Sequence, residues 1–195
     1  MEKKLRTDLD QIATTFDAPK PIKLMFQDEA RFGRISDSVY CWAKRPMRPM
    51  VQAMLTHQYV YAYAAVCPAD GGMDSLVLPH VNGPCMQLFL NEVARRHAQH
   101  NIIMVVDGAG WHKTAFDLPS NLRLHFLPPY SPELNPQELI WHELREKWFH
   151  NRVFDSLDAL EDRLVLALQA LENDLNQVHS IAGWEWIINP VSIDN

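Results

Sequence analysis

A run of five apolar residues at 102–106, Ile-Ile-Met-Val-Val, restricts the possible folds of this chain more than any other feature of its sequence. A short, uninterrupted apolar run is typical of a strand that is buried on both faces of a sheet. Such a sheet carries helices on both sides. The sequence therefore predicts a layered α/β domain, with Asp107 at the end of its central strand.

The remaining predicted elements agree with this architecture. We expect four further strands, in short runs of apolar, β-branched or aromatic residues, at 22–27, 39–42, 59–67 and 122–127. Helices are expected where apolar residues recur at helical spacing, at 82–97, from 135 to about 150, and at 156–175. Strands that come first and are followed by alternating helices and strands predict an α/β fold with a mixed sheet flanked by helices.

The length of 195 residues suggests one domain with terminal extensions. We expect an N-terminal arm or linker at 1–20, the main domain at 21–179 and a C-terminal tail at 180–195. Hydrophobic residues make up 47% of the chain, which is enough for a core and excludes a disordered protein. We expect no membrane helix and no secretory signal. The three cysteines form no CxxC pair, which favours a reducing cytoplasm.

The net charge of −6 at pH 7 argues against a protein that binds nucleic acid, because such proteins usually carry an excess of lysine and arginine. A metal-dependent nuclease is an exception, since it concentrates carboxylates that bound cations neutralise. A separate DNA-reading domain can also supply most of the affinity. The net charge alone therefore neither supports nor excludes binding to nucleic acid.

Three carboxylates occupy positions that suit a metal site. Asp28 is expected to end the first strand, Asp107 ends the central strand, and Glu138 lies in the first turn of a helix. Ligands of open α/β sheets gather beyond the carboxyl ends of strands, and carboxylate oxygens favour hard cations such as Mg²⁺ or Mn²⁺. Each residue also has an ordinary structural interpretation: a strand end, an Asp-Gly turn, and a capping box that begins at Asn135.

Three blocks of sequence around these carboxylates resemble the catalytic domain of bacterial insertion-sequence transposases of the mariner superfamily. The blocks are QDEARFGR at 27–34, VVDGAGWHK at 105–113 and LPPYSPELNPQELIW at 127–141. The third is the most specific, because Pro-Pro-Tyr-Ser-Pro followed by Leu-Asn-Pro-x-Glu rarely arises by chance. The resemblance implies a ribonuclease-H-like fold in which an Asp-Asp-Glu triad holds two Mg²⁺ or Mn²⁺ ions. Carried over residue by residue, the triad is Asp28, Asp107 and Glu138.

The activity implied by this resemblance is metal-dependent DNA cleavage and strand transfer at transposon ends. Two ions can activate the attacking oxygen and stabilise the leaving oxygen of a phosphodiester. The implied partners are double-stranded DNA, at the transposon ends and at the target, and a second copy of the chain on that DNA. The implied location is the cytoplasm, at the nucleoid when DNA is bound. Two alternatives remain open: a nuclease of the same fold without strand transfer, and an inactive DNA-binding or regulatory remnant of a transposase.

Several basic residues near the triad are candidates for phosphate contacts. They are Arg31, Arg34, Lys44, Arg45, Arg48, His112 and Lys113. A solvated basic loop is the competing interpretation of the segment at 42–49. Two neighbours of the triad are expected to play no direct part in a metal site. Glu29 should point to the opposite face of the strand from Asp28, and His142, one turn after Glu138, favours packing or an indirect role.

Overall fold

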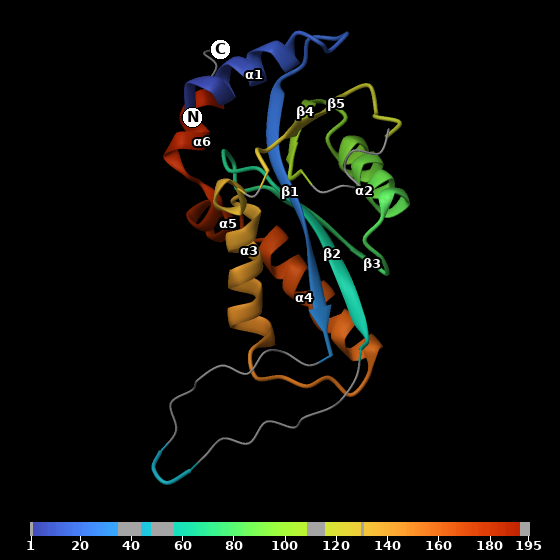
Figure 1. Ribbon diagram of the computed structural model, residues 1–195, viewed down its shortest axis with the longest axis vertical. Coiled ribbons are helices and arrows are strands. Elements are labelled where there is room, and N and C mark those ends of the chain that lie inside the picture. The colour runs from blue at the N-terminus through green and yellow to red at the C-terminus, as the bar shows by residue number, and fades with distance from the viewer. Residues whose placement is uncertain (1, 35–43, 48–56, 109–115, 130, 192–195) are drawn as a thin grey trace.

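The computed structural model describes residues 2–34, 44–47, 57–108, 116–129 and 131–191. Its centre is a five-stranded sheet in the order β3-β2-β1-β4-β5 (Figure 1). The strands are β1 (Ile22–Gly33), β2 (Tyr59–Val66), β3 (Met73–Leu78), β4 (Asn101–Val106) and β5 (Leu122–Phe126). β2 pairs antiparallel with both β1 and β3, whereas β4 pairs parallel with both β1 and β5. The predicted mixed sheet is confirmed.

The apolar run at 102–106 forms nearly all of β4, and every residue of that strand is buried. Its side chains alternate between two core clusters, one with Ile103 and Val105 and the other with Ile102, Met104 and Val106. β4 lies between β1 and β5. The prediction of a central strand that is buried on both faces is therefore confirmed.

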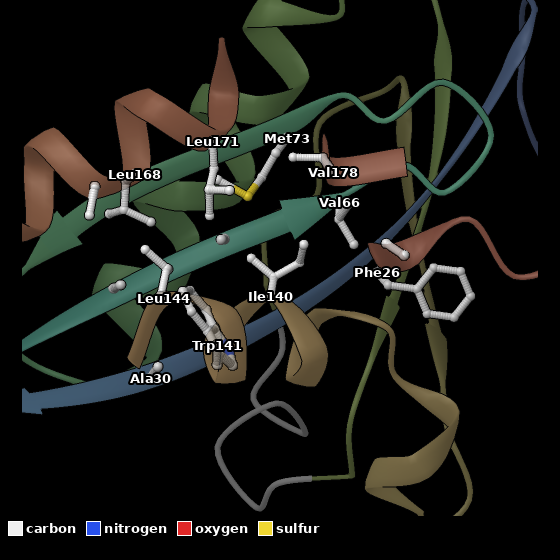
Figure 2. Packing of buried hydrophobic residues seen from close by; sticks show 14 of the residues in the cluster. Phe26, Ala30, Val66, Met73, Ile140, Trp141, Leu144, Leu168, Leu171 and Val178 are labelled. Atoms are coloured by element: carbon white, nitrogen blue, oxygen red, sulfur yellow. The ribbon is translucent and has the colours of Figure 1, made fainter. Parts of the chain in front are cut away.

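Helices cover both faces of the sheet (Figure 1). α2 (Gly83–Arg96) packs on one face and starts where the sequence predicted, with the Asn82 side chain accepting a hydrogen bond from the Cys85 N–H at 2.9 Å. The other face carries α3 (Gln137–Leu144), α4 (Leu157–Glu172) and α5 (Leu175–Ala182). Figure 2 shows apolar side chains of these three helices gathered over β1 and β2. This second layer carries the candidate site.

The helix predicted from 135 to about 150 is formed by two elements, α3 and the π-helical turn η3 (Arg145–Phe149) that follows it. A single 3₁₀ turn, η2 (Pro132–Leu134), precedes the predicted range. The face of α3 that points to the sheet is apolar, with Ile140, Trp141 and Leu144 all buried. This stripe fixes α3 on the sheet, and the polar residues of its first turn lie at the sheet's centre.

The sequence placed the end of the first strand at Asp28, and this prediction is wrong. β1 continues to Gly33 because its second half pairs with β2, from Phe26 opposite Val66 to Gly33 opposite Tyr59. Charged residues at 28, 29 and 31 suggested a strand end in the sequence. The partner strand nevertheless satisfies the backbone hydrogen bonds there, so Asp28 lies in the middle of β1.

β3 was not predicted from the sequence, because its polar residues mask the strand pattern. Asp74 is buried in β3, where it accepts a hydrogen bond from Arg96 at 3.1 Å and pairs with His97 at 2.6 Å. Both partners lie at the end of α2, so the burial of this carboxylate depends on a distant element. The strand predicted at 39–42 lies outside the described residues.

Both ends of the described chain pack on the domain. α1 (Glu2–Ala13) contacts α6 (Glu185–Val191) and β4. Leu9, Ala182 and Ile187 are buried in the same core cluster as the inner residues of β1. The segments expected to form an arm at 1–20 and a tail at 180–195 thus contribute core residues. Within the described residues, no helix combines the length and apolar composition that a bilayer crossing requires.

Candidate active site

The register of two neighbouring strands brings Asp28 and Asp107 together. β1 and β4 are parallel, and Phe26 lies opposite Val105. Asp28 and Asp107 each follow two residues later. Because side chains alternate along a strand, both carboxylates point to the face occupied by Phe26 and Val105, which is the face that α3 covers.

Asp28, Asp107 and Glu138 line one cavity of about 440 Å³. Glu138 reaches it from the first turn of α3 and is exposed, whereas the two aspartates are half-buried. The rest of the wall is Gly108, Leu127, Pro128, Pro129, Ser131, Pro132 and Asn135. The cavity therefore has a carboxylate side and an apolar side made of leucine and prolines.

The capping box that the sequence allowed for Glu138 is not formed. In a capping box the Glu138 carboxylate would accept a hydrogen bond from the Asn135 N–H. That N–H instead donates to the Pro132 carbonyl oxygen at 2.9 Å. The Asn135 side chain accepts a hydrogen bond from the Gln137 N–H at 3.1 Å through Oδ1. Asn135 thus caps the turn without Glu138, whose side chain lines the cavity.

The surroundings of Asp28 disfavour its charged form. Burial raises the pKa of its carboxyl group to about 8, and the carboxylates of Glu138 and Glu29 act in the same direction. Hydrogen bonds from the Glu29 N–H and the Trp141 indole oppose this rise because they stabilise the ionised form. A perturbed carboxyl group among other carboxylates in a cavity is typical of a functional site.

The side chains of the cavity fit a divalent cation by their chemistry. Carboxylate oxygens are the ligands that Mg²⁺ and Mn²⁺ prefer. A cation would also offset the repulsion between Asp28 and Glu138, which raises the Asp28 pKa. Among the described residues, no three His, Cys, Asp or Glu side chains are already spaced to hold a metal ion. The three carboxylates thus share one cavity without forming a finished metal cage.

Glu29 lies on the face that the sequence predicted, whereas the packing predicted for His142 is not formed. Glu29 accepts a hydrogen bond from the Gln27 side chain at 2.6 Å, which places it with the alternate residues of β1, on the face opposite Asp28. His142 is exposed and does not line the cavity. Neither residue joins the three carboxylates.

The predicted phosphate-binding residues fall into three groups. Arg31 is exposed and lies over the Tyr59 ring at 4.5 Å, and Lys44 and Arg45 are exposed. Arg34 is half-buried, and its guanidinium group forms hydrogen bonds within the protein. Its Nε donates to the Phe154 carbonyl oxygen at 3.0 Å, and its Nη atoms donate to the Gln58 side chain and the Asp155 carbonyl oxygen. Arg48, His112 and Lys113 lie outside the described residues.

Sequence reasoning gave no role at the site to Trp141. Its indole Nε1 donates to Oδ2 of Asp28 at 2.9 Å, although the ring is 1% exposed. A signal was present, because Trp141 belongs to the apolar stripe of α3 and a buried indole N–H needs an acceptor. The identity of that acceptor depends on a strand more than a hundred residues away.

Comparison with known proteins identifies the family. Residues 23–161 match the family described as DDE superfamily endonuclease. The chain belongs to this family. A relative from Sinorhizobium fredii (strain NBRC 101917 / NGR234), the uncharacterized protein y4pE/y4sA, is 37% identical over 134 residues, which cover 66% of this chain and 96% of the relative.

The fold is similar to that of the Mos1 transposase. The match to a pre-cleavage Mos1 transpososome has a TM-score of 0.64 at 16% identity and covers 100% of this chain and 61% of the Mos1 chain. The match to a Mos1 mariner paired-end complex with Mn has a TM-score of 0.58 at 17% identity, with 100% and 62% covered. The chain thus has the predicted ribonuclease-H-like fold and spans about three-fifths of the Mos1 chains.

Proposed function

We propose that this chain is the catalytic domain of a DNA transposase, with its catalytic part at 21–179 and with α1 and α6 packed on that part. It cleaves phosphodiester bonds at the ends of a mobile element and joins the freed 3′-hydroxyl to target DNA. The observation that carries the proposal is the cavity in which Asp28, Asp107 and Glu138 meet, within the fold of a DDE endonuclease. The cation that those carboxylates fit is Mg²⁺ or Mn²⁺, and two ions are expected.

Each residue of the triad has its own part in this proposal. Asp28, within β1, and Asp107, directly after β4, would hold the ions. Glu138, exposed on α3, completes the site and orients the attacking water or sugar hydroxyl. When bound, the ions lower the pKa of the attacking group and offset charge on the leaving oxygen. The apolar wall of Leu127 and the prolines can pack against the sugar and exclude water from one side of the scissile phosphate.

Double-stranded DNA is the proposed partner, bound by two copies of the chain at the paired transposon ends. This is supported by the Mos1 relatives, which were solved as a transpososome and as paired-end complexes, with Mn in one case and Mg in another. Exposed Arg31, Lys44 and Arg45, together with Arg48, His112 and Lys113, are the proposed phosphate contacts. The net charge of −6 predicts weak, salt-sensitive binding by this chain alone. A cytoplasmic protein at the nucleoid is the setting that this activity implies.

The test is a cleavage and joining assay with DNA that carries the inverted repeats flanking the gene, in the presence of Mn²⁺ or Mg²⁺. Asp107→Asn should reduce cleavage at least about 100-fold, because it removes a charged ligand from the site. Glu29→Gln is the matched control, since it neutralises a carboxylate of β1 on the opposite face, and it should cleave at a rate near that of the wild type.

The products separate the proposal from its alternatives. Metal-dependent nicks at the repeat ends together with joined strands would support the transposase. Cleavage without joined strands would replace it by a nuclease of the same fold. A folded protein that binds DNA but cleaves nothing with either metal would identify an inactive remnant.

A further inference from the structure

Two buried polar side chains, one directly before α3 and one within it, form hydrogen bonds to β1 at the cavity. Asn135 precedes α3 and Trp141 lies in its second turn, so they flank Glu138 in the sequence. Their partners on β1 are adjacent residues, Gln27 and Asp28. Two fixed points on one helix determine its position along the strand and its rotation about its own axis. The pair therefore sets where Glu138 lies relative to Asp28.

The first of these two contacts with β1 is formed by Asn135, which is 3% exposed. Its Nδ2 donates to the Gln27 carbonyl oxygen at 3.0 Å, and its Oδ1 accepts from the Gln137 N–H at 3.1 Å. One amide therefore joins the β1 backbone to the first turn of α3. Both hydrogen bonds are shielded from water, so the loss of either would leave a buried polar group without its partner.

The second contact with β1 is formed by Trp141. Its indole donates to Oδ2 of Asp28 at 2.9 Å, and its ring makes an edge contact with Phe32, with centroids 6.2 Å apart. Asp28, Ala30 and Phe32 share one face of β1, and Figure 2 shows the Trp141 ring beside the small Ala30 on that face. The hydrogen bond fixes the plane of the Asp28 carboxylate. The remaining lone pairs of that carboxylate stay available to a cation.

We propose that Asn135 and Trp141 are positioning residues that arrange Glu138 and Asp28 for cation binding before the cation arrives. The inference rests on the proposed function, because it assigns these residues a task at that same cavity. Their side chains donate hydrogen bonds to Gln27 and Asp28 of β1. They act through the carboxylates, as residues behind metal ligands commonly do, and loss of such partners typically weakens metal binding or activity about 10- to 100-fold.

The test is Mn²⁺ binding by the full chain, measured from free Mn²⁺ in electron paramagnetic resonance titrations. Trp141→Phe keeps the buried ring but removes the N–H, and it should bind Mn²⁺ at least about 10-fold more weakly. Trp148→Phe is its matched control, because that ring stacks on Arg163 and does not touch Asp28. The control should bind within about twofold of wild type.

Asn135→Asp supplies an independent variant that removes only the donor to Gln27. Its added negative charge would by itself strengthen cation binding, so weaker binding must come from lost positioning. Asn173→Asp is the matched control, since the exposed Asn173 donates to the Gln169 carbonyl oxygen in the same way at 2.8 Å. Far-ultraviolet circular dichroism identifies variants that fold, and Trp141→Phe carries the test if Asn135→Asp does not.

The fluorescence of Trp141 gives a spectroscopic readout in variants that keep this residue. Paramagnetic Mn²⁺ held by Asp28 should quench the fluorescence of the adjacent Trp141. In folded Asn135→Asp the quenching should need at least about 10-fold more Mn²⁺, whereas Trp148→Phe should keep the wild-type midpoint. If wild type binds Mn²⁺ and cleaves DNA while folded Trp141→Phe and Asn135→Asp do both at wild-type levels, the inference is overturned and the proposed function stands. If wild type neither binds Mn²⁺ nor cleaves DNA, the proposed function is overturned and the inference with it.

Discussion

Replacing Asp28 by Asn should abolish a specific dependence of stability on pH. In the folded protein, burial first and then the carboxylates of Glu138 and Glu29 raise the pKa of Asp28 from an ordinary 3.8 to about 8. Between these two values the folded chain holds a proton that the unfolded chain has lost. The contribution to stability is therefore fully present below about pH 4 and is lost as the pH rises through 8. Asn cannot titrate, and its amide oxygen can still accept from the Trp141 indole.

The size of the effect follows from proton linkage. One proton that is bound only in the folded state changes the free energy of unfolding by about 1.4 kcal/mol per pH unit. From pH 5 to pH 8 the sum is roughly 3–4 kcal/mol, an upper limit because the half-buried group can relax toward water. We expect the stability of wild type relative to Asp28→Asn to fall by about 2–4 kcal/mol over that interval.

Urea unfolding at pH 5 to 9, with EDTA in every sample, measures this difference. The histidines titrate in both proteins, so their contribution cancels when the two are subtracted. Glu138→Gln provides an internal check, because removing that carboxylate should lower the Asp28 pKa and end the slope at a lower pH. Parallel stability curves for wild type and Asp28→Asn would refute the raised pKa and the crowding of carboxylates that explains it.

Three further predictions concern metal and charge. Mn²⁺ at a hundred times its dissociation constant should stabilise wild type by about 2.7 kcal/mol in thermal melts. Asp107→Asn should lose most of this gain, and the absence of a shift in wild type would contradict the metal site. Arg34→Ala should destabilise the fold by about 2–3 kcal/mol in urea, because it removes the donor to three acceptors. Its folded fraction should bind DNA normally, and weakened binding would restore Arg34 as a phosphate contact. Arg31→Ala should instead leave stability within about 0.5 kcal/mol and reduce the salt slope of DNA binding by about 1. An unchanged slope would exclude Arg31 from the interface.

The sequence by itself determined the elements whose burial pattern is local. The apolar run at 102–106 predicted a strand with two covered faces that ends directly before Asp107, and the structure has this strand. Asn82 and Pro84 marked the start of α2, because caps and prolines act within one turn. The motif at 127–141 predicted Glu138 as the third carboxylate of the site, since several rare residues at fixed spacing carry more information than one carboxylate does.

Tertiary structure decided everything that depends on a partner far away in the chain. β1 extends past its charged residues because β2 completes its hydrogen bonds. β3 likewise pairs with β2, and Arg96 and His97 supply partners for its buried Asp74. The hydrogen bonds of Arg34 to Phe154 and Asp155, on the approach to α4, likewise could not be predicted from the sequence around Arg34.

The contacts between α3 and β1 at the cavity could not be predicted from the local sequence. Trp141 and Asp28 are 113 residues apart, and Asn135 and Gln27 are 108 apart. Periodicity reports that a side chain is buried, but it does not report what the side chain meets there. That is set by strand register and helix packing, which exist only once the whole sheet has formed and α3 has docked on it.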